Sequence, residues 1–289
     1  MIILVFLVTI FATMAIGVPV AFALMFCGIV LMQWMGIFNP VILAQNMIQG
    51  ANTFTLLAIP FFMLAGELMN AGGLSKRIVD FAVACVGHLR GGLGYVAIIA
   101  AIIMASLSGS AAADSAALAS ILIPMMRDAG YKVPRAAGLM ASGGIIAPVI
   151  PPSIAFIIFG VAANVSITGL FLGGIVPGLL MAVTLVVIWA VVARDEDVAV
   201  LPRVSGADRL RATGRAGWAL FMPVIILGGI RFGIFTPTEA AVVAAAYAFF
   251  VGFFVYRELK VRDLYRVFLN AATRNSTTEV ILAALRNTA

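Results

Sequence analysis

The sequence predicts an all-α, polytopic membrane protein, and this prediction rests on its composition and on the position of its charges. Of its 289 residues, 63% are hydrophobic and 10% are charged, whereas a soluble domain carries about 25% charged residues. The first charged side chain is Glu67. Apolar runs of about 20 residues follow, a length that crosses the hydrocarbon core of a bilayer. They lack the two-residue alternation of a transmembrane β-barrel.

The net charge of +6 lies in a few loops, so it predicts membrane orientation and requires no nucleic-acid partner. Cys27 and Cys85 lie in apolar stretches without metal-ligand spacing, and we expect them to be packing residues, with no transition metal. The opening MIILVFLVTI has no basic region before its apolar run, so we do not expect a cleaved signal peptide.

The first apolar segment, residues 3–33, is expected to form a single span that is kinked at Gly17 and Pro19. Residues 38–52 are mildly polar and are expected to lie along the membrane interface. Residues 53–71 form the next expected span.

Basic segments separate the remaining apolar ones. The first of them, GGLSKRIVDFAVACVGHLRGG, predicts an amphipathic helix at the membrane surface. Basic loops are enriched on the cytoplasmic side, so the uncharged connections 34–52 and 161–170 should lie outside and the N-terminus inside. The loops expected in the cytoplasm are 76–90, 127–135, 194–215 and 257–266, and further spans are expected at 171–193, 218–235 and 237–256.

The apolar stretch 91–126 has basic residues beyond both of its ends, so both ends should be cytoplasmic. As one helix it would be about 54 Å long at 1.5 Å per residue, whereas the hydrocarbon core is about 30 Å thick. The chain must therefore turn back, and we predict a re-entrant helical hairpin with its tip near Leu107 to Gly109. The alternative is two ordinary spans with a polar turn at the outer surface.

The predicted tip is rich in small polar residues and includes an aspartate. Irregular backbone at membrane depth is tolerated where protein buries it or where it lines a water-filled cavity. An ionisable residue such as Asp114 within a span indicates a functional site. For the serines, close helix packing is the alternative reading. The tip residues concerned are Ser106, Ser108, Gly109, Ser110 and Asp114.

A second irregular element is predicted in residues 136–160, where three prolines fall within five positions of SGGIIAPVIPPSIAF. Each proline lacks an N–H and leaves the carbonyl four residues earlier without its helical donor. We therefore predict a broken helix with unpaired oxygens, of the kind that coordinates Na⁺ in secondary transporters. A simple proline kink is the alternative. The prolines are Pro148, Pro151 and Pro152, the carbonyls are those of Gly144, Ala147 and Pro148, and Ser153 lies beside them.

Four segments together resemble the large membrane subunit of the tripartite ATP-independent periplasmic (TRAP) transporters. They are GELMNAGGLSKRIVD, SLSGSAAADSAALASILIPMM, ASGGIIAPVIPPSIAFIIFG and FTPTEAAVVAAAYAFF. The resemblance extends from the start of the chain to about Ala272. It implies a multi-pass permease of the bacterial inner membrane that works with a small four-helix membrane subunit and a periplasmic solute-binding protein.

The resemblance also implies an elevator-type transporter with two inverted repeats, each with a re-entrant hairpin, a broken helix and a Na⁺ site. Substrates would be organic anions: C4-dicarboxylates, sugar acids, sialic acid or keto acids. Na⁺ would be the coupling ion, with no other cofactor and no catalytic residue. The sodium-binding residues implied are Ser106, Ser108, Ser110, Gly144, Ala147 and Pro148, and Gly109, Asp114 and Ser153 would support the tip or the substrate.

The resemblance divides the chain into parts. A first repeat is expected over 1–193, a charged cytoplasmic linker over 194–217 and the start of a second repeat over 218–272, followed by an atypical polar tail over 273–289. Members of the family are longer, and the second hairpin and second broken helix are not found in this sequence. A non-transporting fragment of such a subunit is therefore an alternative expectation.

Two other function classes remain as alternatives on the residues alone. A serine hydrolase built on the hairpin serines would need a base beside the nucleophile, and the one histidine, His88, lies in a basic cytoplasmic segment. An ion channel would require a symmetric pore segment repeated across subunits.

Overall fold

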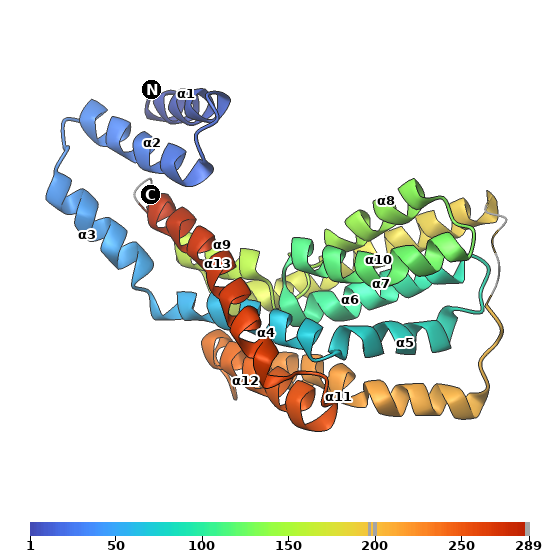
Figure 1. The fold of residues 1–289 in the computed structure, drawn as a ribbon. Coiled ribbons are helices and arrows are strands. Elements are labelled where there is room, and N and C mark those ends of the chain that lie inside the picture. The colour runs from blue at the N-terminus through green and yellow to red at the C-terminus, as the bar shows by residue number, and fades with distance from the viewer. Residues whose placement is uncertain (196–197, 199–200, 287–289) are drawn as a thin grey trace.

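A computed structural model of the chain describes residues 1–195, 198 and 201–286, and every regular element in that part is a helix (Figure 1). The predicted all-α class is confirmed for these residues. Four helices are long and apolar enough to cross a membrane by length and composition: Phe54–Ala71, Ile167–Val192, Gly206–Arg231 and Pro237–Val255. Together with the many exposed large apolar side chains, this fits a multi-pass membrane protein.

The first apolar segment forms two helices, α1 (Ile2–Ala15) and α2 (Val20–Trp34), which run back and forth beside each other (Figure 1). Gly17 adopts a φ of +86°, which reverses the chain between them. The Cys27 thiol of α2 donates to the Phe6 carbonyl of α1 at 3.5 Å. The expectation of a single kinked span over 3–33 is therefore wrong, and it no longer supports an inside N-terminus.

The next helices lead into the core. α3 (Pro40–Ala51) begins where the Asn39 side chain accepts from two backbone N–H groups. The short helix η1 (Phe54–Leu57) continues into α4 (Ala58–Ala71). α4 lies at the centre of the molecule, in contact with α5, α6, α9, α12 and α13. Its buried side chains include Ile59, Phe62, Ala65, Leu68 and Met69.

Helix α5 (Leu74–Val86) has the amphipathic character that its sequence predicts. Its buried stripe recurs at helical spacing and packs against α6 and α11, while Lys76 and Asp80 are exposed. One face of α5 therefore packs against protein, and the face with Lys76 and Asp80 is exposed. The stripe comprises Leu74, Ile78, Val79 and Ala82.

Two connected helices, α6 (Gly92–Ser108) and α7 (Ala111–Asp128), form a helical hairpin closed by Gly109 and Ser110. They pack against each other, and α8 (Val133–Gly144) packs against both. The chain is not helical from 145 to 153 and resumes as α9 (Ile154–Ala162). Helix breaks therefore occur in the two places where the sequence predicts them.

The remaining helices carry the chain past the predicted linker. α10 (Ile167–Val192) is followed by η2 (Ala193–Asp195). α11 (Gly206–Arg231) is one continuous helix, so the second half of the predicted linker 194–217 is helical. α12 (Pro237–Phe250) begins with a capping box between Thr236 and Glu239 and continues as the π-helix η3 (Val251–Val255). α13 (Val261–Arg286) is the last helix, and the side chains of the predicted polar tail beyond Thr273 lie outside the described residues.

Candidate functional site

The hairpin tip is a two-residue reversal that glycine and serine make possible. Gly109 ends α6 with a φ of +62°, in the left-handed region that side chains other than glycine rarely adopt. Ser110 then caps α7, and its hydroxyl accepts from the Ala113 N–H at 3.5 Å. Helix α7 therefore presents the positive end of its dipole at the tip.

Asp114 lies in the first turn of α7 and is almost fully buried, with 2% of its surface exposed. The Ser108 hydroxyl donates to Asp114 Oδ1 at 2.5 Å, and the Ser110 N–H donates to Ser108 Oγ at 3.1 Å. The second carboxylate oxygen, Oδ2, is buried and has no hydrogen-bond partner among the described residues. A buried acceptor of this kind is costly unless a ligand satisfies it. The tip therefore offers an oxygen for a bound cation or donor.

In the broken helix, two of the three carbonyls predicted to be unpaired have donors. The Gly144 carbonyl accepts from the Ala147 N–H at 3.1 Å, because the chain tightens after α8. The Pro148 carbonyl accepts from the Ser153 hydroxyl at 2.5 Å. For the Ala147 carbonyl, no donor is found in the described part of the chain. The prediction of three unpaired oxygens is thus corrected, although each carbonyl retains a second lone pair.

Ser153 has a further role that joins the break to the next helix. Its hydroxyl accepts from the Phe156 N–H at 3.2 Å and so caps α9, while the side chain is fully buried. The positive end of the α9 dipole therefore lies at the break.

The hairpin tip and the break are in direct contact. A Cβ placed on Gly109 would overlap the Pro152 carbonyl oxygen and would lie 3.1 Å from Ser153 Cα. On α8, a Cβ at Gly144 would overlap the Ser115 hydroxyl of α7. Glycine at these two positions therefore allows the backbones to approach, and the N-termini of α7 and α9 meet at one junction.

Not every residue singled out in the sequence faces this junction. The Ser106 hydroxyl donates to the Ile103 carbonyl of its own helix at 2.7 Å. Ser108, Gly109, Ser110 and Asp114 surround the tip, and Pro148 and Ser153 bond to each other at the break.

Sequence reasoning missed two neighbours of the tip. Gly66 of α4 faces Ser108, since a Cβ at Gly66 would lie 3.1 Å from Ser108 Cβ. Ser115 donates to the Met140 carbonyl of α8 at 3.4 Å. Gly66 could have been noticed, because a glycine inside an apolar span often marks a close approach of another segment. Ser115 carried none beyond its position after Asp114.

His88 contacts Arg209 and none of the hairpin serines among the described interactions. Its Nδ1 lies 3.4 Å from Arg209 Nη2, and the serine hydroxyls of the tip bond to Ile103, Asp114 and a backbone N–H instead. Among the described contacts, the histidine therefore lies beside none of these serines, and the carboxylate bonded to one of them is that of Asp114, which accepts from Ser108.

Residues 7–288 match the family model described as the DctM component of the tripartite ATP-independent periplasmic transporter. The 2,3-diketo-L-gulonate TRAP transporter large permease protein YiaN of Escherichia coli is 53% identical over 284 residues, which cover 98% of this chain and 67% of the relative. The sialic acid large permease SiaM of Vibrio cholerae is 40% identical over 269 residues, 93% of this chain and 62% of that protein.

The C4-dicarboxylate large permease DctM of Pseudomonas aeruginosa is 44% identical over 229 residues, which cover 79% of this chain and 54% of that protein. The chain thus spans between about half and two thirds of the length of these relatives. With the match over nearly all its residues, the chain belongs to the family of the DctM component, the large permease protein of the TRAP transporters.

Proposed function

We propose that the chain forms part of the large permease subunit of a Na⁺-coupled TRAP transporter that imports an organic anion across the bacterial inner membrane. The relatives are named for diketogulonate, sialic acid and C4-dicarboxylates, all of which carry carboxylate groups. In this proposal the permease works with a small four-helix membrane subunit and a periplasmic solute-binding protein, and residues 1–193 are its first repeat.

The observation that carries the proposal is the junction between the hairpin tip and the helix break. Two helix N-termini, at Ser110 and Ser153, meet there beside the buried carboxylate of Asp114. Helix N-termini attract anionic substrate groups, while unwound backbone and hydroxyl oxygens suit Na⁺. The junction therefore offers groups that suit an anionic substrate and groups that suit Na⁺.

The re-entrant arrangement of the hairpin is also part of the proposal. α6 has 17 residues and α7 has 18, which corresponds to about 26 Å each at 1.5 Å per residue. A basic residue lies at each outer end of this helix pair: Arg90 precedes α6, and Arg127 lies in the last turn of α7. In this proposal the hairpin enters and leaves on the cytoplasmic side and its tip lies within the bilayer, where elevator movement would expose it alternately.

For the Na⁺ site we propose the tip oxygens together with the break. The first ligands would be the hydroxyls of Ser108 and Ser110 and the Ala147 carbonyl, which has no donor among the residues described. The second lone pairs of the Gly144 and Pro148 carbonyls would complete the set. Asp114 Oδ2 supplies the negative charge nearby. Ser106 would have to leave the Ile103 carbonyl before it could take part.

Thermal unfolding of the purified chain in detergent tests the site directly, in NaCl against KCl at equal ionic strength. A ligand that binds only the folded state stabilises it, by about 2.7 kcal/mol when present at one hundred times its Kd. We expect Na⁺ to raise the unfolding temperature of the wild type, and Asp114→Asn and Ser108→Ala to reduce this shift.

Ser120→Ala is the matched control, because Ser120 lies on the same helix, is exposed, and donates to the Ala117 carbonyl one turn earlier, away from the tip. If Na⁺ and K⁺ act alike on the wild type, or if the control loses the Na⁺ shift equally, the site assignment fails. Uptake measured against Na⁺ concentration in the complete tripartite system then tests coupling.

A further inference from the structure

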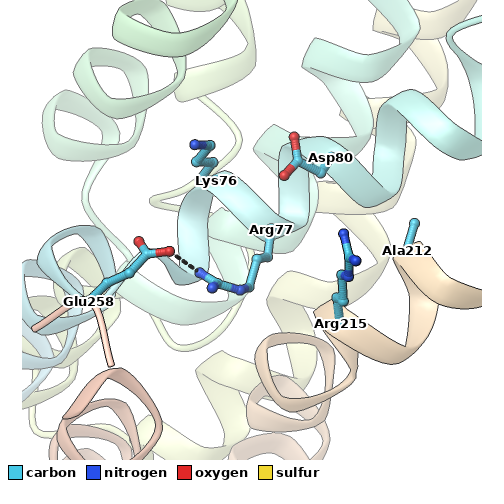
Figure 2. Close-up of a pocket in the computed structure, with 6 residues that line it drawn as sticks. All are labelled: Lys76, Arg77, Asp80, Ala212, Arg215 and Glu258. Atoms are coloured by element: carbon cyan, nitrogen blue, oxygen red, sulfur yellow. Dashed lines mark hydrogen bonds and ion pairs between the residues drawn. The ribbon is translucent and has the colours of Figure 1, made fainter. Parts of the chain in front are cut away.

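A charged pocket lies apart from the hairpin junction, between α5, α11 and the turn after η3. It has a volume of about 290 Å³ and is lined by Lys76, Arg77, Asp80, Ala212, Arg215 and Glu258. Figure 2 shows the Arg77 side chain between Glu258 and Arg215. Three cationic side chains from two helices thus converge on one cavity, opposed by two carboxylates.

Arg77 is held in a fixed orientation. Its Nη1 donates to Glu258 Oε1 at 2.8 Å and to the Gly73 carbonyl at 3.0 Å. Its guanidinium lies 3.8 Å from the ring centroid of Tyr256. Both of these hydrogen bonds use Nη1, so the Nε and Nη2 donors have no hydrogen-bond partner among the described residues. A guanidinium that is ordered in this way presents a fork suited to two phosphate oxygens.

The other two cations are available to a ligand. Lys76 and Arg215 are exposed, and neither forms an ion pair with a carboxylate in the described part of the chain. The Arg215 backbone is fixed, since its carbonyl accepts from the Tyr256 hydroxyl at 2.8 Å. The pocket therefore combines one ordered guanidinium with two exposed cationic side chains that form no ion pair in the described part of the chain.

Exposed aromatic residues near the pocket indicate where it lies relative to the membrane, and therefore which phosphate could reach it. On α11, Arg215 is followed one turn later by Trp218, which is 46% exposed, and then by exposed Phe221. On the other side, the chain before Tyr256 exposes Phe250 and Phe254. Trp is enriched at the membrane–water interface, where headgroup phosphates lie, and exposed Phe side chains next to it suit the adjoining hydrocarbon region.

We propose that this pocket binds the phosphate of an anionic phospholipid headgroup, with Arg77 as the fixed donor and Lys76 and Arg215 closing around it. Basic pockets between membrane helices on the cytoplasmic side are suited to such headgroups. Lys76 and Arg77 lie in the first turn of α5, within the basic segment 76–90 that is expected to be cytoplasmic, which agrees with this assignment. Asp80 opposes binding and limits the affinity.

Native mass spectrometry of the purified full chain in detergent, titrated with dioleoyl phosphatidylglycerol, tests the proposal. A basic residue near an anionic lipid surface contributes about 1 kcal/mol, which is about fivefold in affinity. We therefore expect Lys76→Gln and Arg215→Gln each to lower phosphatidylglycerol affinity about fivefold. Asp80→Asn should raise it.

The matched control is Arg211→Gln, which removes the same charge one turn earlier on α11 from a side chain that is 73% exposed and paired with Asp208 at 3.4 Å. An equal loss in this variant would mean a general charge effect and would overturn the proposal. So would binding of phosphatidylglycerol no tighter than that of phosphatidylcholine. Displacement of the lipid by millimolar inorganic phosphate would assign the pocket to free phosphate instead.

Discussion

At the scale of single residues, the turn at the hairpin tip requires glycine, because a larger side chain at Gly109 would overlap the neighbouring backbone. Gly109 combines a left-handed backbone with a close approach to the Pro152 carbonyl, and the neighbouring serines hold the buried Asp114 carboxylate. The polar bonds at the tip are local, since Ser108, Ser110 and Asp114 lie within seven positions of one another. The contact of Gly109 with the break, in contrast, joins segments about 40 residues apart.

Gly109→Ala should destabilise the chain and weaken Na⁺ binding. The substitution adds a residue with an unfavourable φ, which costs about 1 kcal/mol, and its Cβ overlaps the Pro152 carbonyl oxygen. Thermal unfolding in detergent measures the first effect, and the Na⁺-dependent shift measures the second. Gly138→Ala is the control, because Gly138 lies in α8 and a methyl group there would meet nothing within 4 Å; this change should be neutral or stabilising. Equal behaviour of the two variants would contradict the close contact.

At the scale of elements, the hairpin α6–α7 and the pair α8–α9 form one packed group. α8 lies against both limbs of the hairpin, and the interruption between α8 and α9 faces the tip. Both interruptions end with a serine that caps the next helix, Ser110 for α7 and Ser153 for α9. A serine N-cap therefore begins each of the two helices that meet at the junction.

Cysteine labelling tests the proposed re-entrant topology in a background without Cys27 and Cys85. Leu89 precedes α6, Lys132 follows α7, and both are exposed, so single cysteines there should react with an impermeant reagent from the cytoplasmic side. Ala112 is exposed in the first turn of α7. A cysteine there should react slowly from either side, because the tip would lie at membrane depth. Rapid reaction at position 112 from outside would instead favour two full spans.

At the scale of the whole molecule, residues 1–193 pack against residues 206–286 along several helices, and one of these contacts is a close approach of two glycines. A Cβ at Gly72, between α4 and α5, would lie 2.8 Å from Gly252 Cα in the π-helix η3. The ion pair of Arg77 with Glu258 lies next to this contact. The α4–α5 turn of the proposed first repeat is thus anchored on the second part of the chain, directly beside the proposed lipid pocket.

Gly72→Ala should therefore loosen the contact between the two parts. The new methyl would collide with backbone, so we expect a loss of unfolding free energy of about 1–3 kcal/mol, as for other overpacked sites. Gly228→Ala on α11 is the control, since its Cβ would meet nothing within 4 Å. Thermal unfolding measures both variants. A loss in Gly72→Ala no greater than in the control would show that the turn can shift at little cost.

The sequence alone determined the helical membrane class, the family, and the positions of the helix breaks. These follow from local chemistry: apolar runs set the class, Gly109 and Ser110 end one helix and cap the next, and prolines interrupt the helix after Gly144. The hairpin and the broken helix could thus be located from residues close together in the chain.

Only the tertiary structure decided which segments and polar groups come together. The pairing of α1 with α2 depends on packing between apolar faces, which a run of uniformly apolar residues does not specify. Likewise, proline predicts which carbonyl loses its helical donor, but not that the Ser153 hydroxyl reaches Pro148 or that the tip lies on Pro152. Such contacts depend on how the chain turns after the break, because a carbonyl released from a helix bonds to whichever donor the fold brings near it.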